Sequence, residues 1–158
     1  MDETETMIAA TANNLKRIIV IIATNMPTRT THITPAQLGL PPKIGTLQIP
    51  SISWEDFPRD PPDDSPYLAH IYWTIHYHYP PPLTPPLKQT VSTEVSVMGK
   101  SWWRQVDNPG LLKHEYGHLL IGCLCALEFE KRINWELKKD PSLGMGPWCR
   151  AILSECLK

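Results

Sequence analysis

His114, Glu115 and His118 form the pattern His-Glu-x-x-His within LLKHEYGHLLIG, residues 111–122. At 3.6 residues per turn, positions four apart lie on one face of a helix, so both imidazoles can converge on one ion. Glu115 lies about 100° further round the helix, where it can accept a proton from a water at the open position of that ion. This arrangement is typical of zinc hydrolases and predicts a Zn²⁺ site with Glu115 as the catalytic base.

The surroundings of the motif are strongly apolar, with every residue from 119 to 127 apolar or glycine. We therefore expect this part of the helix to be covered on most sides. Ionisable groups in such a helix are costly unless they have partners, and a metal ion with its water would supply them. The alternative is a structural cluster in which the three side chains satisfy one another. Gly117 would let another backbone pack closely, or is simply tolerated in the helix.

The third metal ligand is not evident on the same helix. No histidine follows His118, and Glu128 lies ten residues on, about 15 Å along the axis. Glu136 could contribute only if the helix broke before it, and Glu155 only if the closing helix folded back far along the chain. The remaining candidates are the histidines of AHIYWTIHYHY, residues 69–79, a segment whose composition favours a strand.

Alternation along residues 69–79 separates an apolar face from a polar one. The polar face carries His70, Tyr72, Thr74, His76 and His78. We take His70 as the candidate third ligand, and Tyr72, His76 and His78 as candidate oxyanion or substrate contacts. Each histidine taken alone is more often a surface or hydrogen-bonded side chain.

Other elements follow from periodicity and proline placement. Strands are expected at 17–24, around 44–50 and at 90–98, and a short helix at 148–158. Asn108 as N-cap and Pro109 at the first helical position predict a long helix from about 109 to 139. These elements predict an α+β fold, a small antiparallel or mixed sheet packed on a long active-site helix. Residues 1–45 are expected as an N-terminal segment with one strand and a proline-rich loop, possibly part of the sheet, before a zincin-like domain at 46–158.

Composition excludes several classes of protein. The 158 residues include 15 Lys and Arg against 16 Asp and Glu, with no local basic excess, so nucleic acid is not expected as a partner. No segment approaches the roughly 20 apolar residues of a membrane helix. The chain starts with acidic rather than basic residues, unlike a secretory signal. The four cysteines, Cys123, Cys125, Cys149 and Cys156, are expected as small buried side chains, with a disulfide to the C-terminal segment as the alternative.

Four segments in this order resemble the DUF922 family of predicted secreted zinc-dependent proteases: ISWEDF at 52–57, DDSPYLAHIYWTIHYHY at 63–79, SWW at 101–103 and LLKHEYGHLLIG at 111–122. The likeness covers about residues 50–128. It implies that His114 and His118 are ligands, that Glu115 is the base and that His70 belongs to the site. It also implies secretion, so secreted and cytoplasmic locations both stay open. The family often has Phe-Asp after the second histidine, where this chain has Leu119 and Leu120.

The expected function is therefore a zinc metallopeptidase acting on a peptide or protein, in the manner of minimal zincins. Two other classes stay open. One is a module in which zinc staples helix to sheet without an open position. The other is a metal-free module that binds a peptide or partner through the aromatic strand and the Trp102–Trp103 pair, although core packing is the more ordinary role of such tryptophans.

Overall fold

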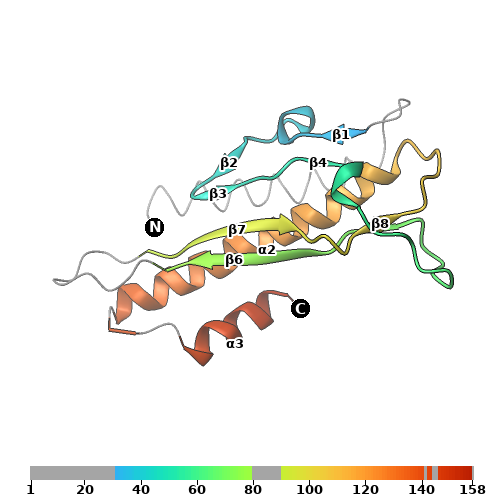
Figure 1. The fold of residues 1–158 in the computed structure, drawn as a ribbon. Coiled ribbons are helices and arrows are strands. Elements are labelled where there is room, and N and C mark those ends of the chain that lie inside the picture. The colour runs from blue at the N-terminus through green and yellow to red at the C-terminus, as the bar shows by residue number, and fades with distance from the viewer. Residues whose placement is uncertain (1–30, 80–89, 141, 144–145, 158) are drawn as a thin grey trace.

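The computed structural model describes residues 31–79, 90–140, 142–143 and 146–157 (Figure 1). The expected strand at 17–24 lies outside these residues. Eight short strands precede two helices: β1 (His32–Ile33), β2 (Lys43–Ile44), β3 (Leu47–Gln48), β4 (Ile52–Ser53), β5 (Ala69–His70), β6 (Trp73–His78), β7 (Ser92–Val97), β8 (Trp102–Trp103), α2 (Leu111–Lys139) and α3 (Pro147–Cys156). Two 3-10 turns, Pro35–Leu38 and Trp54–Asp56, complete the described elements.

The long helix α2 begins two residues later than predicted. Gly110 is its N-cap and makes no side-chain cap, whereas Asn108 accepts from the Gly110 amide at 3.1 Å in a tight turn that precedes the helix. The predicted capping by Asn108 is therefore wrong, because its side chain closes that turn instead. The predicted end is confirmed: Lys138 and Lys139 occupy the last turn, and Asp140 precedes Pro141, where a helix is disfavoured.

The predicted hairpin of residues 69–79 and 90–98 is present, but its first strand is interrupted. β6 pairs antiparallel with β7 from Trp73↔Val97 to His78↔Ser92, and β5 pairs with β8. Between them, the buried Ser101 hydroxyl accepts from the Tyr72 amide at 2.9 Å and donates to the carbonyl of Met98 at 2.8 Å. Side chains thus accept from the amides of Ile71 and Tyr72, where a continuous strand would bond to its partner's backbone, so the prediction of one unbroken strand was wrong.

The sheet and α2 share one core, with α2 running along the strands (Figure 1). The apolar face predicted for the hairpin is the one that packs here, through Ile71, Trp73 and Ile75. A Cβ built on Gly122 would lie 2.8 Å from the Trp73 ring, so this glycine permits the close approach of strand and helix. The predicted α+β class is confirmed, with a 29-residue helix packed on small antiparallel sheets.

Residues 31–45 belong to the same packed unit. β1 pairs with β4 and β2 pairs with β3, all antiparallel, and Ile33, Leu40 and Ile44 lie in the core cluster that contains α2. The expected division at 45/46 falls inside the β2–β3 hairpin, whose turn contains Gly45 at φ 59°. The single expected strand around 44–50 is therefore a two-stranded hairpin.

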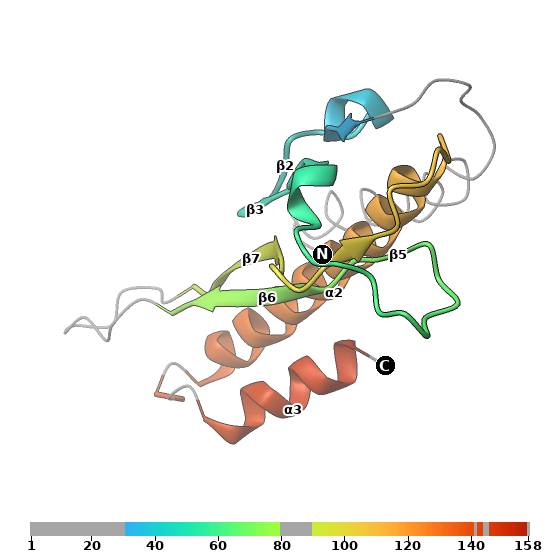
Figure 2. The same cartoon turned by 45° about the vertical axis from the view of Figure 1, so that its right-hand side comes forward.

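The predicted closing helix is present as α3, which lies beside the C-terminal half of α2 in both views (Figure 2). A second, smaller core forms there from Val91, Phe129, Ile133, Leu137 and Cys149. All four cysteines lie in the described part of the chain and none forms a disulfide; Cys123 and Cys149 are buried and the other two are half-buried. Among the described residues, no helix has the length and apolar character needed to cross a membrane.

Candidate metal site on α2

His114 and His118 converge as the helical spacing predicted. Their Nε2 atoms lie 3.1 Å apart, and the rings meet nearly perpendicular, at 85° with centroids 4.8 Å apart. Both side chains are exposed, whereas residues 119–127 are buried or half-buried at every position except Ile121, as the apolar pattern predicted. The histidines are exposed because the sheet covers one side of α2 and they lie outside the covered part.

Glu115 lies on the covered side, with 4% of its surface exposed. Its Oε2 accepts a hydrogen bond of 2.8 Å from the backbone amide of Ile71. In the described part of the chain no buried side-chain oxygen or nitrogen lacks a partner, and Ile71 is the one donor found for this carboxylate. The Oε1 atom therefore has no hydrogen-bond donor among the described residues.

The Ile71 amide shows which edge of this chain segment faces α2. In β5 and β6, alternate residues direct their backbone groups toward β8 and β7, as the Met98 amide bonded to the Tyr72 carbonyl at 2.7 Å illustrates. The backbone groups of Ile71 point to the other edge, where its amide donates to Glu115 of α2. Among the described residues β6 pairs only with β7, so the other edge of this chain segment, which faces α2 at Ile71, has no strand partner along β6.

The polar face of the hairpin does not join the histidine pair. The His70 ring stacks on Tyr72 with centroids 4.2 Å apart, and Lys100 lies over the Tyr72 ring at 4.3 Å. His76 Nε2 lies 3.2 Å from the Ser96 hydroxyl, and His78 lies 3.6 Å from the Glu94 carboxylate. Since the apolar residues of this strand pack toward α2, strand alternation directs these polar side chains to the opposite face.

Two imidazoles at this spacing suit a zinc ion, which prefers nitrogen and sulfur donors. For two nitrogens about 2.05 Å from a tetrahedral ion, simple geometry places them about 3.3 Å apart. The observed 3.1 Å is close to that value. Within the described residues no group of three or more His, Cys, Asp or Glu side chains is arranged to hold a metal, so the structure does not bring His70 to the pair.

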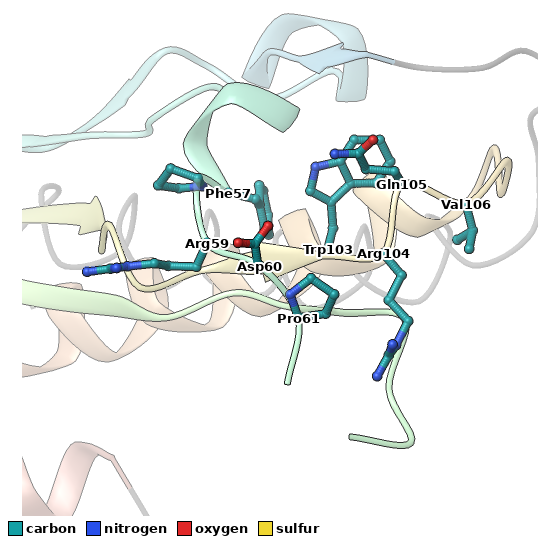
Figure 3. Close-up of a pocket in the computed structure, with 9 residues that line it drawn as sticks. Phe57, Arg59, Asp60, Pro61, Trp103, Arg104, Gln105 and Val106 are labelled. Carbon is teal, nitrogen blue, oxygen red and sulfur yellow. The ribbon is translucent and has the colours of Figure 1, made fainter. Parts of the chain in front are cut away.

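A separate cavity of about 420 Å³ lies between residues 57–61 and 103–106 (Figure 3). Its lining residues are Phe57, Pro58, Arg59, Asp60, Pro61, Trp103, Arg104, Gln105 and Val106. The sequence offered little sign of it, because residues 57–66 read only as an acidic, proline-rich loop. The cavity does not include His114, Glu115 or His118.

The start of α2 is anchored to the loop after β3. Tyr116 is fully buried, and its hydroxyl donates to the Pro50 carbonyl at 3.0 Å. Burial, with a smaller contribution from the neighbouring Cys123, raises the pKa of this phenol well above its usual range. Tyr116 therefore stays neutral and positions the helix turn that carries the histidines.

No protein-family model, no curated protein and no solved structure matches this chain. The resemblance to DUF922 proteases therefore rests on the sequence motifs alone.

Proposed function

We propose that the protein is a zinc-dependent peptidase whose metal is held by His114 and His118. The observation that carries this proposal is the 3.1 Å between the two Nε2 atoms, which fits two ligands of one ion. Zinc bound there would act as a Lewis acid and lower the pKa of water toward neutrality. His70 remains the third ligand that the sequence suggests, although its ring lies against Tyr72 in this structure.

Glu115 is the proposed general base. Its Oε2 is fixed by the Ile71 amide at 2.8 Å, which orients the carboxylate and leaves Oε1 as the proton acceptor. A base held by a backbone hydrogen bond loses little freedom when it takes a proton, because its position is already set. The same carboxylate would then return the proton to the leaving amine.

The proposed substrate is an extended peptide added along the α2-side edge of β5 and β6. Such an edge holds a peptide through backbone hydrogen bonds, largely independent of its side chains. The Ile71 amide already shows that backbone groups at this edge reach the helix. Tyr72, His76 and His78, suggested as oxyanion or substrate contacts, lie on the other face of the strand and are weaker candidates on this geometry.

One observation favours a second candidate, a partner-binding module without catalysis. The described residues provide two clustered histidines and no third ligand, and a 3.1 Å contact is also the length of an ordinary hydrogen bond between two neutral imidazoles. In that case the exposed pair would be a surface feature and Glu115 a purely structural carboxylate.

Metal analysis separates the two candidates. Protein purified without added metal should contain about one zinc per chain by plasma mass spectrometry, and H114A and H118A should each lose it. H76A, which alters an exposed histidine bonded to Ser96, is the matched control and should keep its zinc. H70A tests the third ligand. Wild-type protein that stays free of zinc after reconstitution would exclude the peptidase.

A further inference from the structure

The cavity beside β8 has the size of a ligand site. Its volume of about 420 Å³ lies in the usual range for small-molecule and side-chain pockets, roughly 300 to 1,000 Å³. Two segments more than forty residues apart form its walls, and Figure 3 shows Phe57, Asp60 and Pro61 on one side and Trp103 to Val106 on the other.

The walls are held by contacts that do not use the cavity itself. Trp54 stacks on Trp103 with centroids 4.1 Å apart and an angle of 11°, and it does not line the cavity. One face of the Trp103 indole is therefore covered by Trp54, and another part of the residue lines the cavity. The Arg104 guanidinium donates to the carbonyls of Pro62, Ser65 and Tyr67 at 2.8 to 3.0 Å, which fixes the loop that forms the opposite wall.

Charge indicates which ligand the cavity prefers. Figure 3 shows the Arg59 and Arg104 side chains extending away from the middle of the lining group, whereas the Asp60 carboxylate lies among the aromatic side chains. Arg104 is already bonded to backbone carbonyls. Of the three charged lining residues, Asp60 is therefore the one whose charged group faces the middle of the cavity. A carboxylate beside an indole face suits a cation, through ion pairing and cation–π attraction.

The cavity lies close to the proposed base. Trp103 is the cross-strand partner of Ala69, and Ile71, two residues on, donates its amide to Glu115. Ordinary strand dimensions therefore place Trp103 about 8 Å from Ile71, measured diagonally from one strand to the next. Trp103 also packs against the core cluster that contains α2, so the cavity wall and the helix that carries Glu115 are joined through one core.

We propose that this cavity binds the Lys or Arg side chain of a peptide, with Asp60 as the counter-ion and Trp103 as the stacking surface. That the peptide is a substrate rests on the proposed function, but its binding does not. The cavity would then select basic residues near the bond to be cleaved.

Calorimetric titration of E115Q protein with two capped peptides that differ only in one residue, Arg or the uncharged citrulline, tests the proposal without turnover. The Arg peptide should bind at least tenfold more tightly than the citrulline peptide. D60N added to this background should remove most of that preference. D64N, which removes a carboxylate of the same loop outside the cavity lining, should change it less than twofold.

Equal affinity for the two peptides would overturn the proposal, as would equal losses in D60N and D64N, which would indicate a diffuse acidic surface. Failure of the peptidase proposal would give a different result. Wild-type protein would then cleave no peptide, while the tighter binding of the Arg peptide and its dependence on Asp60 would persist. Conversely, cleavage without any preference for basic residues would leave the peptidase intact and exclude the cavity as its specificity site.

Discussion

Glu115 and Glu130 lie on the same helix, and both accept hydrogen bonds from backbone amides of the strands, but they differ in how many hydrogen bonds they accept. Glu130 accepts from the Thr93 amide and hydroxyl, both at 2.9 Å, and from the Thr46 hydroxyl at 2.6 Å, so both its oxygens are occupied. Glu115 accepts from the Ile71 amide through one oxygen. Glu130 is therefore fully committed to holding the sheet, whereas one oxygen of Glu115 has no hydrogen-bond donor among the described residues.

The same helix also differs between its two sides. The side facing the sheet carries Glu115, Gly122 and Cys123, all buried, whereas His114 and His118, about 100° and 60° round the helix from Glu115, are exposed. The proposed site thus straddles the boundary between core and solvent, where a base can be held rigidly while the ligands stay accessible.

The largest expected effect separates the two carboxylates in catalysis. E115Q should lower kcat/KM for peptide cleavage by about 10² to 10⁴-fold, because the amide can still accept from Ile71 but cannot take a proton. Zinc content should not change. E130Q is the matched control and should stay within about threefold of wild type. Full activity in E115Q would remove it from the mechanism, and an equal loss in E130Q would mean that both act only through the fold.

Loss of the Glu130 carboxylate should affect stability more than catalysis, because both of its oxygens hold the sheet to α2. E130A removes the acceptor for three hydrogen bonds and leaves the amide of the buried Thr93 unpaired, so the free energy of unfolding should fall by about 2 to 4 kcal/mol. T46A removes one of those bonds from an exposed site and should cost about 0.5 to 1.5 kcal/mol. Urea denaturation measures both. A smaller loss for E130A than for T46A would contradict the role assigned to Glu130.

The two glycines of α2 test its covered and open sides. In G122A the new Cβ would meet the Trp73 ring at 2.8 to 3.1 Å, so overpacking should cost about 1 to 3 kcal/mol. Gly117 has nothing within 4 Å of a built Cβ, which supports simple helix tolerance there, and G117A should stabilise by up to about 1 kcal/mol. Thermal unfolding of both variants measures the difference. Equal shifts would show that the sheet does not press on α2 at Gly122.

The smallest effect concerns thiol reactivity. Burial, helped by the nearby Cys125, raises the pKa of the Cys123 thiol to about 12, so this thiol has little thiolate at pH 8. Cys125 and Cys156, half-buried, should be alkylated by iodoacetamide well before Cys123, as peptide mass mapping over time would show. Labelling of Cys123 first would mean that the inner side of α2 opens readily.

The same raised pKa sets the sign of a pH effect. The unfolded thiol ionises near pH 8.5, whereas the folded thiol stays protonated to about pH 12. Unfolding therefore releases a proton in this window, and the contribution of Cys123 to stability falls as pH rises from about 8.5 to 12. C123A should flatten that part of the stability profile. An unchanged slope between pH 8.5 and 10.5 would argue against the raised pKa.

Local pattern determined much of this molecule. Four-residue spacing brought His114 and His118 together, alternation predicted which face of the hairpin is apolar, and the absence of proline from 110 to 140 allowed one long helix. These features follow from the 3.6-residue and two-residue periods of the backbone, which every helix and strand shares. They can be predicted without knowing which segments pack against the helix or the strand.

Tertiary structure decided the rest, because it depends on contacts between distant segments. The sheet covers one side of α2, so Glu115 is buried and the histidines are exposed, although all three lie in one apolar stretch. Ser101 interrupts the first hairpin strand from thirty residues away, and residues 57–61 and 103–106 meet to form a cavity. Periodicity predicts which residues share a face, whereas only packing determines which face is covered.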